Sequence, residues 1–82
     1  MLVNNSGMIV NFGDLVYRIV GDIMVEKQDN HRDKEYYIFI NSSMLTFKKE
    51  NERDIIFARF VECLETRSDF KLDPKQVEFT VR

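Results

Sequence analysis

Four residues that can bind metal ions or exchange protons alternate along one short segment: Asp29, His31, Asp33 and Glu35. Carboxylate oxygens and an imidazole nitrogen at this spacing can converge on a divalent ion. The segment lacks the glycine and the distal glutamate of a calcium-binding loop, and loop residues need not point the same way. A solvated hairpin loop is the simpler interpretation, so the sequence predicts no metal site and no cofactor.

Other kinds of catalysis also lack a recognisable motif. His31 is the only histidine, so any imidazole acid–base chemistry would depend on it. No nucleophile elbow surrounds a serine, and the three glycines are too dispersed to form a phosphate-binding loop. We therefore expect a protein that is not an enzyme. A small metal-dependent enzyme that uses Asp29 and His31 is the least favoured of three hypotheses.

A second group of residues combines aromatic rings with positive charge. Tyr36 and Tyr37 lie in an apolar segment, and Lys48 and Lys49 follow it. Aromatic rings on an open sheet can stack on bases while cations contact phosphates. However, acidic residues alternate with the cations, and no ribonucleoprotein motif is present. Core packing explains the aromatic residues more simply, and direct nucleic-acid binding through these four residues is the alternative.

An acidic row is the third candidate site. Glu62, Glu65 and Asp69 share one side of a helix if the helix continues that far, and the row is then about 10 Å long. That length is comparable to a few phosphate steps along a DNA strand. The row, together with Asp29 and Asp33 in the loop, could contact a basic groove. The simpler explanation is a solvated helix face that nearby arginines partly neutralise.

A helix over residues 51–68 is the clearest element that must position these groups. Asn51 can cap its first turn, and Asp54 adds a negative charge near the positive end of the helix dipole. The apolar side chains recur at helical spacing and predict a buried stripe. The stripe consists of Ile56, Phe57, Phe60, Val61 and Leu64.

Residues 11–20 fit two structures. Their apolar side chains lie at helical spacing, Asn11 can cap a helix, and Gly21 suits the position after its end. The rival is a strand over residues 14–20, which the β-branched side chains favour. We expect the helix.

The remaining segments alternate in hydrophobicity or are apolar on both sides, as strands do. Strands are expected over residues 22–28, 34–40, 44–48 and 76–82. The strand at 34–40 is apolar on both faces and should lie inside the sheet. Phe70 and Leu72 should anchor the connector at 69–75, and residues 1–7 could be disordered.

The sequence therefore predicts a single α+β domain over residues 1–82. Two helices would pack on one face of a mostly antiparallel four-stranded sheet, in the order α-β-β-β-α-β. A net charge of −2 argues against a strongly basic nucleic-acid-binding protein. One cysteine excludes an internal disulfide, and no apolar run reaches the length of a membrane span. We expect a cytoplasmic protein, with a homodimer through a sheet edge as one option.

These observations favour a small non-catalytic binding protein that modulates or inhibits a protein partner. In the preferred version, acidic residues occlude a basic nucleic-acid-binding surface and act as a nucleic-acid mimic. The order of segments and the chain length are loosely similar to those of small phage inhibitors, although no motif identifies a family.

Overall fold

The computed structural model describes residues 2–82, and the side chains of residues 4–6 lie outside the description. It contains six strands and one helix. The elements in chain order are β1 (Leu2–Asn11), β2 (Val16–Asn30), β3 (Glu35–Ile40), β4 (Ser43–Phe47), α1 (Glu50–Thr66), β5 (Phe70–Lys71) and β6 (Phe79–Val81).

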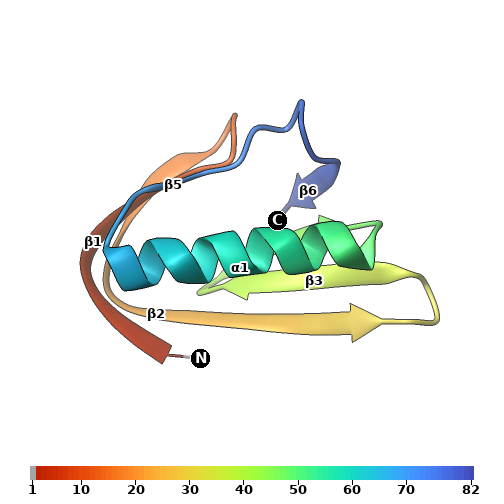
Figure 1. Ribbon diagram of the computed structural model, residues 1–82, viewed down its shortest axis with the longest axis horizontal. Coiled ribbons are helices and arrows are strands. Elements are labelled where there is room, and N and C mark those ends of the chain that lie inside the picture. Colours follow the sequence, from red (N-terminus) through yellow and green to blue (C-terminus); the bar gives the residue numbers. More distant parts are fainter. Residues whose placement is uncertain (1) are drawn as a thin grey trace.

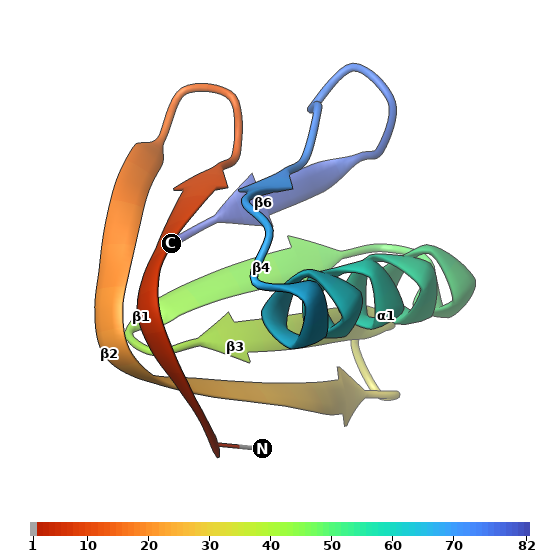
Figure 2. The same cartoon turned by 60° about the vertical axis from the view of Figure 1, so that its left-hand side comes forward.

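The strands form one mixed sheet in the order β5-β1-β2-β3-β4-β6. All pairings are antiparallel except that of β1 with β5. The sheet curls, and α1 lies along its concave side (Figures 1 and 2). The predicted fold class is therefore wrong. The protein is mostly β, with one helix in place of two and a curled, mixed six-stranded sheet in place of a mostly antiparallel four-stranded one.

The predicted helix over residues 11–20 is wrong. β1 ends at Asn11, residues 12–15 form a turn, and β2 begins at Val16. Val16 and Val20 lie at helical spacing on the apolar side of that expected helix, yet they are 55% and 70% exposed on the outside of the sheet. The pattern that prevails has period two: Ile19, Ile23 and Val25 are buried on the inner face. Gly21 occupies an inward position of this series and interrupts its apolar alternation, which hid the strand.

The curl originates where β1 and β2 bend together. Asn5 pairs with Gly21 and Met8 pairs with Ile19, so two residues of β1 lie opposite one residue of β2. An extra residue of this kind is a β-bulge, which bends a strand and increases its twist. Gly21 has φ +91°, a conformation that favours glycine. After the bend, β2 leaves β1 and pairs with β3 over Val25–Asn30.

The core fills the space between the concave face of the sheet and α1. Ile56, Phe60 and Leu64 are buried as predicted, and Phe60 meets Phe70 edge to face with ring centroids 5.0 Å apart. Burying an aromatic side chain of this size contributes about 1.5–3 kcal/mol. The buried sheet residues include Met8, Val10, Ile23, Val25, Ile38, Ile40, Leu45 and Phe47.

The ends of α1 differ from the prediction. The N-cap is Lys49, which makes no side-chain cap hydrogen bond, and Asn51 lies inside the first turn. The acidic side chains of Glu50 and Glu52 instead offset the positive end of the helix dipole. The helix ends at Thr66, because Arg67 takes a left-handed conformation and its N–H donates to the Cys63 carbonyl. Asp69 therefore lies beyond the helix.

The segment after α1 supplies both edge strands of the sheet, β5 at one edge and β6 at the other. Phe70 and Leu72 are buried, which confirms that they anchor the connector. β6 pairs with β4 and lies at one edge of the sheet, so the expected closing strand is confirmed but is only three residues long. At the other end of the chain, residues 2–7 belong to β1, and Met1 lies outside the described residues. Within the described part, the helix is too short and too polar to cross a membrane.

Candidate functional site

The solvent face of α1 carries two acidic side chains without intramolecular partners. Glu62 and Glu65 are exposed, and no ion pair engages either carboxylate in the part of the chain that the structure describes. Ile55 lies on the same face, two helical turns before Glu62, and is 58% exposed. This face thus combines negative charge with one exposed apolar side chain.

The arginines expected to neutralise the acidic row do not pair with it. Arg59 donates a hydrogen bond to the Lys71 carbonyl at 3.3 Å, and its guanidinium lies 5.9 Å from the centroid of the Phe70 ring. Arg67 is the left-handed residue that ends the helix. The negative charge of Glu62 and Glu65 therefore remains available to solvent.

The other three predicted acidic contacts have internal roles. A carboxylate oxygen of Asp69 accepts a hydrogen bond from the Ile9 N–H at 3.0 Å, which ties the connector to β1. Asp33 accepts a hydrogen bond from the side chain of Asn30 and stabilises the β2–β3 turn. Asp29 forms an ion pair with Arg53 at 2.6 Å. The structure therefore does not extend the row of Glu62 and Glu65 along the helix to Asp69.

The two tyrosines of the nucleic-acid alternative lie on opposite faces of β3. Tyr36 pairs with Asp29 and Phe47 on the inner face, whereas Tyr37 pairs with Thr46 on the outer face. Only Tyr37 can therefore belong to an external binding surface. A prediction that treats neighbouring strand residues as one surface fails because successive side chains alternate between faces.

Tyr37 lines a groove of about 660 Å³ on the outer face of β3, β4 and β6. The lining includes three cations, Lys34, Lys48 and Arg82, but also Asp33, Glu35 and Glu78. Lys48 pairs with Glu78 at 3.4 Å, and the Tyr37 hydroxyl donates to Glu35 at 3.0 Å. Lys49 is the helix N-cap and does not line the groove. The positive charge of this groove is thus largely compensated.

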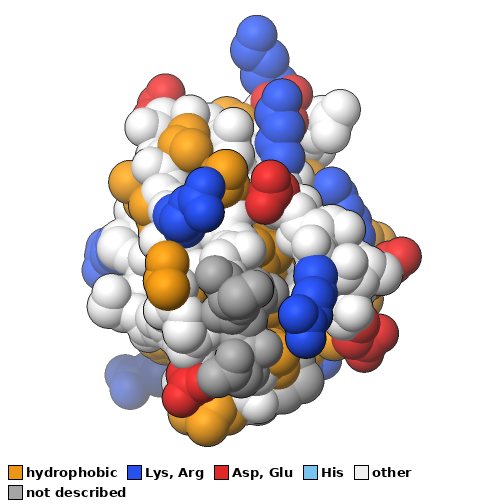
Figure 3. All heavy atoms as spheres, turned by 90° about the vertical axis from the view of Figure 1, so that its left-hand side faces the viewer, with side chains coloured by type: hydrophobic (Ala, Val, Ile, Leu, Met, Phe, Trp, Pro, Cys, Tyr) orange, Lys and Arg blue, Asp and Glu red, His pale blue; other side chains and the backbone are white. Residues whose placement is uncertain are grey.

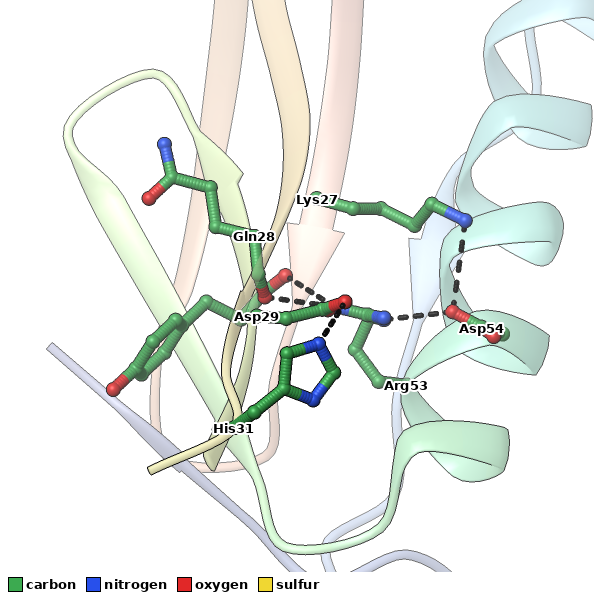
Figure 4. Close-up of polar contacts among 7 residues, drawn as sticks. Lys27, Gln28, Asp29, His31, Arg53 and Asp54 are labelled. Atoms are coloured by element: carbon green, nitrogen blue, oxygen red, sulfur yellow. Dashed lines mark hydrogen bonds and ion pairs between the residues drawn. The ribbon is translucent and has the colours of Figure 1, made fainter. Parts of the chain in front are cut away.

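Sequence reasoning missed the central role of Arg53. Arg53 is 3% exposed and is the one buried charged residue in the described part of the chain. It links α1 to the paired ends of β2 and β3 (Figure 4). One nitrogen, Nη1, approaches the Asp29 carboxylate and donates to the Gln28 carbonyl at 2.8 Å, while Nε donates to Asp54 at 2.7 Å. The ring of Tyr36 lies 5.6 Å from its guanidinium carbon.

The interactions of Arg53 favour its own ionised form and that of Asp54. Burial lowers the pKa of Arg53, but hydrogen bonds and charges from Asp29 and Asp54 outweigh it and raise the pKa. The hydrogen bond from Arg53 lowers the pKa of Asp54. One sequence signal could have identified Arg53 as buried. Its helical spacing to Ile56, Phe60 and Leu64 places the arginine on the apolar stripe.

Of the four alternating residues that the sequence analysis considered as metal ligands, the structure brings only two together. Asp29 and His31 lie close, with 3.5 Å between a carboxylate oxygen and Nε2, whereas Asp33 and Glu35 have the other partners described above. Glu50, from the first turn of α1, takes their place near Asp29 and His31. No sequence pattern pointed to Glu50, because it lies 19 or more residues away from His31 and Asp29 along the chain.

The outer face of β1 and β2 also exposes apolar side chains. Leu2, Val16, Val20 and Met24 are each more than 40% exposed there. Figure 3 shows that hydrophobic atoms on this side of the molecule are scattered among charged and polar ones. Scattered apolar residues are normal on protein surfaces and do not define a binding patch.

Comparisons of the chain with protein-family models, curated proteins and solved structures return no match.

Proposed function

We propose that the protein is a non-catalytic binding protein that contacts a basic surface of a protein partner through the solvent face of α1. The observation that carries this proposal is the pair of exposed, unpaired carboxylates of Glu62 and Glu65. Opposite charges on a partner would accelerate encounter and fix the orientation of the complex.

The net negative charge of α1 supports a contact with a basic surface. α1 contains five carboxylates and two arginines, and one of these arginines, Arg53, is buried. The exposed side chain of Ile55 offers an apolar contact on the same face, which a purely electrostatic surface would lack. Interfaces of this kind combine a desolvated apolar contact with charged surroundings. Asp29, Asp33 and Asp69 are weaker contacts, because internal partners already engage them.

The preferred partner is a nucleic-acid-binding protein. Its phosphate-binding surface would present clustered lysines and arginines, and the acidic helix would occupy them in place of phosphates. The protein would then inhibit its partner by competing with nucleic acid.

Charge reversal tests this proposal. The bait proteins are the wild type and the double variant Glu62→Lys/Glu65→Lys, with Asp14→Lys/Glu26→Lys as a matched control on exposed loop and strand positions. We expect the wild type and the control to capture a basic nucleic-acid-binding protein from lysate. The Glu62→Lys/Glu65→Lys variant should bind the captured protein more slowly and with a weaker salt dependence. Equal binding by all three proteins would refute the proposal.

A second candidate, direct binding of single-stranded nucleic acid, has one specific observation in its favour. The groove on the outer face places Tyr37 near Lys34, Lys48 and Arg82. The test is retention of a labelled single strand at low salt, with Tyr37→Ala as the variant and Tyr36→Phe as the inner-face control. This candidate requires that affinity fall steeply with salt and that only Tyr37→Ala weaken it. Failure of the wild type to retain the strand would eliminate it.

A further inference from the structure

Three side chains of types that can bind metal ions converge beside the buried Arg53, two from the β2–β3 region and one from α1. Asp29 lies near the end of β2, His31 lies in the following turn, and Glu50 opens α1. One ligand atom from each residue lies within 4.8 Å of the other two. We propose that these residues form a binding site for a divalent transition-metal ion such as Zn²⁺. The site does not include Ile55, Glu62 or Glu65, on which the proposed function rests.

The spacing of the ligand atoms suits one ion after a small adjustment. Zn²⁺ binds nitrogen and oxygen ligands at about 2.0–2.2 Å, so two ligand atoms of a tetrahedral site lie about 3.4 Å apart. The three ligand atoms now lie within 4.8 Å of one another, so the exposed side chains of His31 and Glu50 must move closer to Asp29 to bind one ion. An imidazole with two carboxylates selects zinc and its neighbours over magnesium or calcium, which prefer oxygen alone. Water would complete the coordination.

Neighbouring residues hold two of the three ligands in place. Arg53 binds one oxygen of Asp29, and the other oxygen faces Nε2 of His31 at 3.5 Å (Figure 4). The His31 ring packs edge to face on Tyr36, with centroids 6.3 Å apart. Metal-binding carboxylates are typically held by hydrogen bonds of this kind, which orient them before the ion arrives.

The nearby positive charges do not cancel the site. Asp54 accepts from Arg53 at 2.7 Å and pairs with Lys27 at 3.6 Å, so it offsets part of their charge. The three carboxylates of Asp29, Glu50 and Asp54 carry three negative charges. The two cations, Arg53 and Lys27, carry two positive charges. A net negative charge therefore remains to attract a cation.

Calorimetric titration of ZnCl₂ into the protein, with any affinity tag removed, tests the proposal. We expect one ion per chain, and affinity at least tenfold lower in both His31→Ala and Glu50→Gln. Both residues are exposed, and circular dichroism verifies that the variants fold. Glu52→Gln, in the same helical turn, and Cys63→Ser, which removes the only thiol, should bind as the wild type does.

Titration with MgCl₂ and CaCl₂ tests the predicted preference, and both should bind more weakly than zinc. In nuclear magnetic resonance spectra recorded during the zinc titration, the ring signals of His31 should shift at lower zinc concentrations than the signals of residues outside the site. Absence of zinc binding by the wild type, or equal affinity after His31→Ala, would overturn the proposal.

Discussion

The Arg53 guanidinium lies 2.6 Å from the Asp29 carboxylate, and this contact joins residues 24 positions apart in the chain. It fastens the first turn of α1 to the end of the long bent strand β2. The same guanidinium donates to the Gln28 carbonyl, so the helix is bound to the backbone of the sheet as well as to a side chain. The position of α1 over the curl therefore depends on a polar anchor in addition to its apolar stripe.

Replacing Arg53 with methionine should strongly destabilise the protein. The variant keeps most of the apolar contact but loses the hydrogen bonds to Gln28 and Asp54 and the ion pair with Asp29. Removing one member of a buried ionic group typically costs about 3–5 kcal/mol. We expect about 3 kcal/mol by urea unfolding, because both carboxylates are partly exposed and can be rehydrated. Arg32→Met, on the exposed β2–β3 turn, should change stability by less than about 0.5 kcal/mol.

Acid should weaken the anchor through Asp54. Its pKa is lower in the folded protein than its ordinary value because Arg53 donates a hydrogen bond to it. A carboxyl of this kind stabilises the fold above its unfolded pKa of about 3.9, and the contribution is lost as the pH falls through the folded value. The free energy of unfolding should therefore decrease less in Asp54→Asn than in the wild type between about pH 5 and about pH 2.

The effect of Asp54 should be small, because its side chain is 46% exposed and solvent screens the interaction. Its dependence on Arg53 supplies the control. In an Arg53→Met background, Asp54→Asn should change the pH dependence of unfolding less, because only the weaker pair of Asp54 with Lys27 remains. An undiminished difference in that background would show that Arg53 is not the main cause of the lowered pKa.

Two glycines with similar backbone angles should respond differently to alanine. Gly13 has φ +93° and Gly21 has φ +91°, so each substitution should cost about 1–2 kcal/mol from backbone strain. A Cβ on Gly13 would also lie 2.9 Å from Pro74, whereas a Cβ on Gly21 would have no atom of the described residues within 4 Å. Thermal unfolding should therefore show a larger loss for Gly13→Ala. An equal loss would mean that the turn and Pro74 move apart at little cost.

The thiol of Cys63 should react slowly in the native protein. Burial raises its pKa, the charges of Glu62 and Asp69 raise it further, and Arg59 opposes them. Because the thiolate is the reactive form, alkylation by iodoacetamide near neutral pH should be several-fold slower than in urea. Glu62→Gln should accelerate the native reaction by removing one negative charge. Identical rates in the native and unfolded protein would contradict this prediction.

The sequence by itself predicted the elements whose patterns depend on near neighbours. The apolar stripe of α1 is one case, since Ile56, Phe60 and Leu64 are brought to one side by helical geometry alone. The strands near 34–40 and 44–48 are another, because their apolar runs end at clear turn residues. The position of β3 inside the sheet followed from its apolar character on both faces.

Only the tertiary structure decided whether residues 16–20 form a helix or a strand. Their side chains fit both the helical period and the two-residue period of a strand. The strand prevails because its backbone forms hydrogen bonds with β1. Tertiary structure also brought Glu50 to His31 and Arg53 to Asp29. These contacts depend on how the sheet curls and where α1 crosses it. No periodicity along the chain records such distances, because they arise from the packing of elements that are remote in sequence.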